Sequence, residues 1–331
     1  MTAVYSGNKY QKVYQKELEK LEKKLSVLLE NKEPKSLYEP CSYVIRSGGK
    51  RLRPFLVLIS AKAAGGKFSQ AYNAAIAVEL VHNFTLVHDD IMDNADLRRG
   101  RPTLHVKYDM STAILAGDNL IVLAYQFLLK DSKINSNKVT STFTQGIIDV
   151  CEGQSLDKDY EVKEEVSLDE YMIMIEKKTA ALAAMCCSIG AQIGGGSARE
   201  IKALTDYGMN LGIAFQIQDD LLDIIGKEEF GKNVGGDLLE GKKTYLFLTA
   251  LSKADGENKE DLIKVIKNKG IRKNQIKKYQ KIYNDLGVIE DSRKAIEQYT
   301  NYALENLRYI KNKESKEMLE WLANSLIKRN K

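Results

Sequence analysis

The amino-acid sequence predicts an all-α protein, and three observations carry this prediction. Proline is rare, and none follows Pro102 in a chain of 331 residues, so long helices need not be interrupted. The proline-free part is rich in Leu, Ala, Lys and Glu, which favour helix. No segment alternates apolar and polar residues between hairpin turns, as a strand would. An apolar fraction of 44% suffices for a sizeable core, and we expect one domain over residues 1–331.

The N-terminal third is expected to contain three helices. Leucines at helical spacing predict an amphipathic helix over about 10–30, and we expect Pro34 and Pro40 to break it. The next helix should begin near Pro54, because proline suits the first helical turn. A long apolar helix then ends at about Asp93.

A charged loop and further helices make up the rest of the chain. The segment 94–102 is expected to be a loop, and it contains Arg98 and Arg99. Four helices are then expected at about 109–130, 138–156, 167–193 and 198–225. The third begins with a capping box, in which Ser167 and Glu170 satisfy each other's backbone N–H groups. Lys-rich helices complete the chain.

Composition excludes several classes of protein. The net charge of +5 comes from interspersed Lys and Glu, a pattern typical of solvated helix faces. A nucleic-acid-binding protein would show a basic stripe with interleaved aromatic residues, which this sequence lacks. The four cysteines have neither zinc nor C-x-x-C spacing, so we expect buried thiols in a reducing setting. Because the N-terminus is polar, we expect no secretory signal. The apolar run 114–129 is interrupted by Asp118, so we expect a buried helix there and not a membrane span. We therefore expect a cytoplasmic protein.

Two acidic clusters of the form Asp-Asp-x-x-Asp lie in apolar helical segments. They are Asp89, Asp90 and Asp93, and Asp219, Asp220 and Asp223. At about 100° per residue, the carboxylates of each cluster fall within an arc of about 100°. This charge is costly on an apolar face unless a cation neutralises it, and Mg²⁺ often joins one or two carboxylates to substrate phosphates. The pair predicts a diphosphate clamped by metal between two helices, although each cluster alone could be a solvated helix face.

Basic side chains suited to phosphate lie in four segments. These are Gly48–Arg53, Arg98-Arg99, Lys177-Lys178 and Gly241–Lys243. Arginine favours bidentate phosphate contacts, lysine supplies point charge, and glycine backbone brings N–H groups close to an anion. Together they predict two anion sites, one held by metal and one by arginine and lysine. His82 is expected to face the basic site, whereas His88 and His105 are as readily structural.

The sequence offers no covalent nucleophile for the reaction. No serine or cysteine with a nearby base stands out, and neither a Walker loop nor a G-x-G-x-x-G motif is present. The carboxylate-rich setting favours hard cations over zinc. We therefore expect metal-assisted departure of diphosphate, with protein groups stabilising charge.

These motifs, in this order, resemble the signature set of the trans-isoprenyl diphosphate synthases, the family of farnesyl and geranylgeranyl diphosphate synthases, and most closely the archaeal type of geranylgeranyl diphosphate synthase. The resemblance covers about residues 38–245 and is looser beyond them. It implies a single all-α domain of long helices around a deep apolar cavity, and a homodimer. It also implies that isopentenyl diphosphate condenses head to tail with an allylic diphosphate (dimethylallyl, geranyl or farnesyl), which lengthens the chain by five carbons.

The resemblance assigns residues to each substrate. Both triplets, including Asp223, would hold three Mg²⁺ ions against the allylic diphosphate. The catalytic residues would be Asp89, Asp90, Asp93, Lys178, Asp219 and Asp220. The allylic diphosphate would also contact Arg98, Lys178, Thr179, Gln216, Lys232 and Lys242. Isopentenyl diphosphate would contact Gly49, Lys50, Arg53, His82 and Arg99. The sequence departs from the family at Asn233, where proline is common, and at Ala95, where an acidic residue is common, so loop closure could differ.

Product length is predicted from residues that precede the first triplet. Phe84 lies about 7–8 Å down the helix from Asp89, on the cavity side if the carboxylates face the cavity, and its large ring would limit the growing chain. The smaller Thr85 removes a second barrier, and Val81 lies further down. This pattern resembles archaeal enzymes that make the C20 product. A C15 or C25 product stays open, as does an ordinary core role for Phe84.

Other functions fit the sequence less well. A terpene cyclase or head-to-head condensing enzyme also uses aspartate-rich helices. The segment Gly48–Arg53 and the second complete triplet argue against this reading, since a cyclase needs no second basic diphosphate site. A catalytically silent partner of a synthase should have lost one triplet or the basic motifs, and this chain keeps both. A helical scaffold would tolerate the loss of Asp89 or Asp219.

Overall fold

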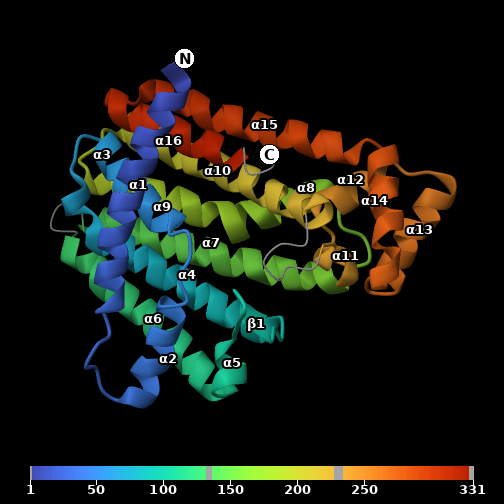
Figure 1. Ribbon diagram of the computed structural model, residues 1–331, viewed down its shortest axis with the longest axis horizontal. Helices are drawn as coiled ribbons and strands as arrows, with labels where there is room; N and C mark the ends of the chain where they lie inside the picture. The colour runs from blue at the N-terminus through green and yellow to red at the C-terminus, as the bar shows by residue number, and fades with distance from the viewer. Residues whose placement is uncertain (1, 132–135, 227–233, 328–331) are drawn as a thin grey trace. The chain divides into compact units, whose positions relative to one another are not determined.

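The computed structural model describes residues 2–131, 136–226 and 234–327, and it is built almost wholly of helices (Figure 1). This confirms the all-α fold class. In the described ranges the strands are β1 (Leu97–Arg98) and β2 (Arg101–Pro102), an antiparallel hairpin within the segment expected to be a loop. The chain divides into two compact units. Unit 1 comprises Met1–Gln145, Met185–Thr205 and Tyr309–Trp321, and unit 2 comprises Gly146–Ala184, Asp206–Arg308 and Leu322–Lys331. A single domain stays a prediction.

Unit 1 contains the N-terminal helices, and four helices contribute to both units. The helices of unit 1 are α1 (Thr2–Ser26), α2 (Lys35–Ile45), α3 (Leu52–Ala63), the 3₁₀ turn η1 (Phe68–Gln70), α4 (Tyr72–Met92), α5 (Leu104–Lys107) and α6 (Met110–Asp131). The helices that contribute to both units are α7 (Ser136–Val162), α9 (Ala181–Ile193), α10 (Ala198–Ile225) and α16 (Lys313–Ile327).

Unit 2 contains the remaining elements. They are α8 (Leu168–Ile175), a π-helical turn η2 (Glu176–Ala180), α11 (Gly236–Leu239), α12 (Tyr245–Lys253), α13 (Gly256–Lys267), η3 (Lys273–Gln275), α14 (Ile276–Asp285), α15 (Val288–Asn306) and η4 (Leu307–Tyr309), whose last residue belongs to unit 1. The expected helix over about 167–193 is thus divided by the π turn into α8 and α9. Its capping box is confirmed, since Ser167 Oγ accepts from the Glu170 N–H at 3.2 Å and Glu170 Oε2 accepts from the Ser167 N–H at 2.9 Å.

Helix α4 is central to unit 1 and packs against α3 and α6 (Figure 1). Its buried run includes Ala74, Ala75 and Ala77, and α6 buries Ala113 and Ala116. Small side chains on both helices let their backbones approach closely. This packing fixes the end of α4, which carries the first aspartate triplet.

The N-terminal segment buries leucines as predicted, but only one of its two prolines lies outside a helix. Leu21, Leu25 and Leu29 are buried, as the amphipathic stripe predicts. Pro34 precedes α2 as its cap residue, but Pro40 lies inside α2 and is buried there. The prediction that Pro40 breaks the helix is therefore wrong. Proline costs one backbone hydrogen bond, and burial of the apolar ring offsets part of that loss.

Two expectations about buried groups also need correction. Helix α6 is not buried all round, because Leu115, Val122 and Leu129 are 59%, 66% and 57% exposed. Within the described residues, Met110–Lys130 of this helix is the one segment long and apolar enough to cross a membrane, judged by length and composition alone. Among the cysteines, Cys151 is exposed on α7, whereas the other three are buried free thiols as expected.

The core of unit 2 forms around α12. This helix buries Leu246, Phe247 and Leu248 and packs against α8, α13, α14 and α15. Ile217 and Leu221 of α10 belong to the same apolar cluster. The end of α10, which carries the second aspartate triplet, is therefore anchored in a well-packed core.

Candidate active site

The first aspartate triplet lies at the C-terminal end of α4. Asp90 is buried, Asp89 is half-buried and Asp93 is exposed. The Nε of Arg98 donates to Asp90 Oδ1 at 2.5 Å. Burial raises the pKa of Asp90, and the Arg98 charge opposes this rise. Carboxylates at the negative end of the helix dipole are unfavourably placed, so this end of α4 is suited to attract a cation.

The β1–β2 hairpin directs two arginines to different places in unit 1. Its tight turn uses positive φ at Arg99 and Gly100, 55° and 73°. Arg98 meets Asp90 of the triplet, whereas Arg99 Nη1 donates to the carbonyl of Gly48. Gly49 has a φ of 142°, which would strain any other residue, and a Cβ there would lie 2.9 Å from Arg99 Nη1 and displace the guanidinium. The hairpin therefore separates an arginine at the carboxylates from an arginine at the glycine loop.

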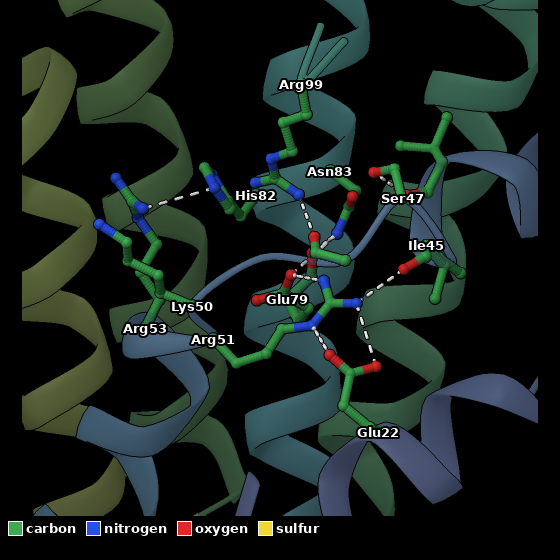
Figure 2. Close-up of polar contacts among 12 residues, drawn as sticks. Glu22, Ile45, Ser47, Lys50, Arg51, Arg53, Glu79, His82, Asn83 and Arg99 are labelled. Atoms are coloured by element: carbon green, nitrogen blue, oxygen red, sulfur yellow. Dashed lines mark hydrogen bonds and ion pairs between the residues drawn. The ribbon is translucent and has the colours of Figure 1, made fainter. Parts of the chain in front are cut away.

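A basic cluster, defined as Lys50, Arg53, His82 and Arg99, surrounds this glycine loop (Figure 2). Arg53 Nη1 lies 3.4 Å from His82 Nε2, and Arg53 Nε is buried with no hydrogen-bond partner among the described residues. Burial lowers the pKa of Arg53. Burial, then the charges of Arg53 and Arg99, holds the pKa of His82 well below its usual range, so the imidazole is neutral. The cluster has excess positive charge and an unsatisfied donor, which suit it to an anion.

Arg51 does not join this cluster, although its position in Gly48–Arg53 suggested a phosphate contact. Its guanidinium is directed toward Glu22 and Glu79, whereas Arg53 extends toward His82 (Figure 2). The expectation of three basic side chains available to phosphate in this segment is wrong for Arg51. The side chain turns inward because two carboxylates, 29 residues before it and 28 residues after it, pair with it there.

The second triplet lies at the end of α10, and its middle residue is held by several donors. Asp220 Oδ2 accepts from the Tyr171 hydroxyl and from the Tyr245 N–H at 3.1 Å, and its Oδ1 accepts from Gln216 Nε2 at 2.9 Å. Burial raises the pKa of Asp220 to about 6, although these hydrogen bonds act in the opposite direction. Asp219, by contrast, is exposed. One carboxylate is thus held in place while its neighbour faces solvent.

The last residue of the second triplet anchors the segment that follows. Asp223 accepts backbone N–H groups of Gly236 and Asp237 through its two oxygens, each at 3.1 Å. Burial and the neighbouring charges of Asp220 and Asp223 raise the pKa of Asp237 to about 8. This end of unit 2 is therefore crowded with carboxyl groups.

The π turn connects Lys178 and Thr179 to the second triplet. Thr179 Oγ1 donates to Gln216 Oε1 at 2.9 Å, and Gln216 in turn donates to Asp220. Lys178 Nζ pairs with Asp157 of α7. The extra residue of a π turn shifts the helical register and often occurs at functional sites. The structure thus joins three of the predicted residues, Thr179, Gln216 and Asp220, in one hydrogen-bond chain.

Two lysines of the prediction lie in the segment after the triplet. Lys242 Nζ pairs with Glu240 Oε2 at 2.8 Å and lies 4.0 Å from Asp237 Oδ1. Lys232 and Asn233 lie outside the described residues. Tyr171, Asp157 and Asp237 were not predicted as neighbours of site residues. Only Asp237 had a signal, because it stands in a glycine-rich loop before Lys242.

The carboxylates of the two triplets suit Mg²⁺ that is shared with a substrate, rather than a metal ion whose ligands all come from the protein. Both triplets offer only carboxylate oxygen, the ligand type that Mg²⁺ prefers. In the described parts of the chain, no three His, Cys, Asp or Glu side chains converge as a ready metal site. Mg²⁺ commonly takes one or two carboxylates and completes its shell with water and substrate phosphate. An incomplete protein ligand set is consistent with that mode.

The residues expected to limit product length lie along α4. By helical geometry, Thr85 is about 40° around the helix from Asp89, whereas Phe84 is about 140° away. Phe84 therefore does not share the face of the Asp89 carboxylate, contrary to the expectation that it lies on the carboxylate side. The Phe84 ring packs edge to face on His88, with centroids 4.7 Å apart. A Cβ on Gly117 of α6 would overlap His88 Nε2. The side chains of Phe84 and His88 therefore project from the same side of α4, toward Gly117 of α6. Val81 is buried one turn before Phe84.

The chain is similar to a family model, to curated proteins and to solved structures. The family model described as "Polyprenyl synthetase" matches residues 34–286. A geranylgeranyl pyrophosphate synthase of Geoglobus acetivorans is 39% identical over 309 residues, which are 93% of this chain and 95% of that protein. A geranylgeranyl diphosphate synthase of Saccharolobus solfataricus is 41% identical over 304 residues, 90% and 91% of the two chains. The crystal structure of geranylgeranyl pyrophosphate synthetase from Pyrococcus horikoshii superposes with a TM-score of 0.91 at 35% identity, covering 97% of this chain and 99% of that one.

Proposed function

Because the chain belongs to the polyprenyl synthetase family, we propose that it condenses isopentenyl diphosphate head to tail with allylic diphosphates and that its main product is geranylgeranyl diphosphate (C20). The observation that carries this proposal is the presence of two differently built anion sites. One kind of site is rich in carboxylates and needs metal to hold a diphosphate. The other is the basic cluster, where Arg53 has an unsatisfied donor and a neutral histidine beside it.

The allylic diphosphate is assigned to the two aspartate triplets. Bound Mg²⁺ would neutralise the diphosphate and make it a better leaving group. Asp89, Asp90 and Asp93 at the end of α4, and Asp219, Asp220 and Asp223 of α10, are the carboxylates that would hold it, and Asp223 also fixes the following segment. Arg98, Lys178, Thr179, Gln216 and Lys242 would add direct contacts, as would Lys232. The hydrogen-bond chain from Thr179 through Gln216 to Asp220 would hold these three side chains in place.

Isopentenyl diphosphate is assigned to the basic cluster. Arg53 and Arg99 supply planar guanidinium groups suited to phosphate oxygens, and Lys50 adds charge. Neutral His82 can donate a hydrogen bond without requiring a proton from solvent. Gly49 brings backbone close to the anion while leaving space for Arg99. This site needs no metal, because its charge comes from the protein alone.

The reaction then proceeds without a covalent enzyme intermediate. The allylic carbon–oxygen bond breaks and the electron pair leaves with the diphosphate. The isopentenyl double bond attacks the allylic cation and forms the new carbon–carbon bond. A proton lost from the resulting cation goes to the departed diphosphate, and a double bond re-forms. The protein's own part is to hold both diphosphates and exclude water, which is consistent with the lack of a nucleophile in the sequence.

Product length is assigned to the face of α4 that meets α6. Phe84, packed edge to face on His88, would form the floor that the growing chain meets, with Val81 below and Thr85 on the carboxylate side. Gly117 of α6 lies against His88. We assign a C20 product to this floor, and the C15 and C25 products are the alternatives. The two relatives compared above carry geranylgeranyl synthase names, which favours C20.

A second copy of the chain is proposed to cover α6. Leu115, Val122 and Leu129 recur every seven residues and are each more than half exposed, which makes an apolar stripe on one helix face. Asp118 and Gln126 on the same helix favour a protein partner over lipid. We assign a cytoplasmic homodimer. A dimer in light scattering that Val122→Glu converts to monomer would support this assignment, and a monomeric wild-type protein would contradict it.

A product assay tests the proposed activity. Purified protein with Mg²⁺ and isopentenyl diphosphate would receive dimethylallyl, geranyl or farnesyl diphosphate, and the alcohols would be analysed after dephosphorylation. A dominant C20 alcohol, abolished by EDTA, is the expected result. A C15 or C25 alcohol would keep the reaction and overturn the assignment of the floor. If no primer gives a product, the chain is a silent partner of a synthase rather than the enzyme.

A further inference from the structure

We propose that Arg51 is a positioning residue for the isopentenyl diphosphate site: its buried side chain holds the loop Gly48–Arg53 in the shape that presents Lys50 and Arg53 to the diphosphate. This inference rests on the proposed function, because it assigns a role within that binding site. Arg51 itself would not touch the substrate.

The guanidinium of Arg51 joins three helices. Its Nε donates to Glu22 Oε1 of α1 at 2.6 Å, and its Nη2 donates to Glu22 Oε2 at 3.3 Å. Nη2 also donates to the carbonyl of Ile45, the last residue of α2, at 2.7 Å, and Nη1 donates to Glu79 of α4. The side chain of Arg51 has no exposed surface. One residue of the loop is thereby fixed to α1, α2 and α4 at once (Figure 2).

The backbone of the loop requires such a fastening. Gly48, Gly49 and Arg51 all have positive φ, 76°, 142° and 44°. The left-handed conformation is ordinary for glycine but unfavourable for arginine, because its Cβ crowds the following carbonyl. Arg51 stands at the cap position of α3 in this conformation, and its side chain makes no capping hydrogen bond there. The contacts with the carboxylates are therefore what hold a strained residue at the start of α3, two positions before Arg53.

Charge separates the roles of the two arginines. Arg51 has two carboxylate partners, and these raise its pKa against the effect of burial. Arg53 has no carboxylate within hydrogen-bond distance among the described residues, and its Nε is unsatisfied. A guanidinium that already pairs with two carboxylates gains little binding free energy from a substrate anion, whereas a guanidinium without a carboxylate partner gains more. The loop thus uses one arginine as an anchor and the other as a ligand group.

Two further contacts hold the same loop and depend on its shape. The Tyr14 hydroxyl of α1 donates to the carbonyl of Lys50, and Arg99 donates to the carbonyl of Gly48. Both acceptors are backbone atoms, so they lie in place only if the loop keeps its turn. Loss of the Arg51 anchor would therefore displace Lys50 and loosen Arg99 as well. Because small misplacement of binding groups has large effects on affinity, isopentenyl diphosphate should be the substrate affected.

Steady-state kinetics with each substrate varied in turn tests the inference. Arg51→Gln removes both ion pairs. Glu22→Gln removes one charge from a partly exposed residue, so this second variant tests the same anchor with less risk to folding. Arg46→Gln is the matched control, because Arg46 is an exposed arginine just after α2 that pairs with Glu30 at 3.3 Å, outside the loop. For Arg51→Gln we expect the KM for isopentenyl diphosphate to rise about tenfold or more, and for Glu22→Gln about threefold. The KM for the allylic substrate and kcat should stay within about twofold of wild type, and the control should not change.

The outcomes separate this inference from the proposed function. Variants with an unchanged KM for isopentenyl diphosphate, but a lower melting temperature or a smaller active fraction, would overturn the positioning role and leave Arg51 as ordinary structure. An equal rise in both KM values would overturn it too. If Arg51→Gln does not fold, the Glu22→Gln result decides. If wild-type protein forms no product, it is the proposed function that fails.

Discussion

The hydrogen bond from Tyr171 to Asp220 makes a measurable prediction about stability. Tyr171 is 3% exposed, and its hydroxyl donates to the Asp220 carboxylate in the core of unit 2. Tyr171→Phe removes only the hydroxyl, so packing is retained. A hydrogen bond to a charged group contributes about 1.5–3 kcal/mol. We therefore expect the substitution to lower the free energy of unfolding of the metal-free protein by about 2 kcal/mol at pH 8, where Asp220 is ionised.

The effect should depend on pH in a defined direction. The pKa of Asp220 is about 6 in the folded protein, above the ordinary value of 3.8, and the Tyr171 hydrogen bond acts to lower it. Without that donor the folded-state pKa rises further, so the variant binds more protons than wild type around pH 6 and loses stability relative to it as pH increases. At pH 5, where Asp220 is mostly protonated, the cost should shrink to about 1 kcal/mol, as for a neutral hydrogen bond.

Tyr283→Phe is the matched control. Tyr283 is 1% exposed in the same unit, but its hydroxyl has no hydrogen-bond partner among the described residues. Removing an unsatisfied buried hydroxyl should be neutral or stabilising. Urea unfolding of both variants and wild type, at pH 5 and pH 8 with EDTA, measures the difference. Equal losses for the two variants, or a loss for Tyr171→Phe that does not grow with pH, would refute the reasoning.

Three further predictions concern catalysis, charge and product length. Asp89→Ala and Asp219→Ala should each lower turnover by about two orders of magnitude or more with the circular dichroism spectrum unchanged, and an unaltered rate in either would contradict metal binding by that triplet. Because burial and the neighbouring arginine charges hold the folded pKa of His82 well below 6.5, its contribution to stability is present above pH 6.5 and is lost as pH falls. His82→Gln should remove that part of the wild-type pH dependence in urea unfolding, and equal slopes would count against it. Gly117→Ala would push His88 toward Phe84, so the product distribution should shift from C20 toward C15, and an unchanged distribution would remove these residues from the floor.

Periodicity and turn chemistry were enough to predict the helices that carry the aspartates. The helix predicted over about 198–225 is α10, Ala198–Ile225, and the helix predicted to end at about Asp93 is α4, Tyr72–Met92. Each triplet has the spacing that puts three carboxylates on one side of a helix, and this depends only on helical geometry. Local patterns of this kind can be read directly from the sequence.

Contacts between distant residues could not be predicted in this way. Arg51 turns inward because Glu22 and Glu79 are brought together by the packing of α1 and α4, and nothing within Gly48–Arg53 signals this. The sequence around Tyr171 likewise gives no sign that its hydroxyl will reach Asp220, 49 residues later. In both cases the decisive partner is supplied by tertiary structure rather than by neighbours in the chain.

The π turn and Pro40 show a different limit. Glu176–Ala180 is a charged stretch between two apolar segments, but it contains no proline or glycine, so the single-residue shift that presents Lys178 and Thr179 could not be predicted from it. Pro40 was expected to end a helix on propensity alone, but it lies buried inside α2. Packing outweighed local preference there, as it often does when an apolar ring can be buried.

The central claim is that two diphosphates are held by different means, one through metal and one by the basic cluster alone. Calorimetric titration of the wild-type protein with isopentenyl diphosphate, and separately with the unreactive farnesyl thiolodiphosphate, each with Mg²⁺ and with EDTA, tests it most directly. We predict that isopentenyl diphosphate binds in both conditions with affinities within about threefold, whereas the farnesyl analogue binds only with Mg²⁺. Loss of isopentenyl diphosphate binding in EDTA, or undiminished binding of the farnesyl analogue there, would contradict the claim.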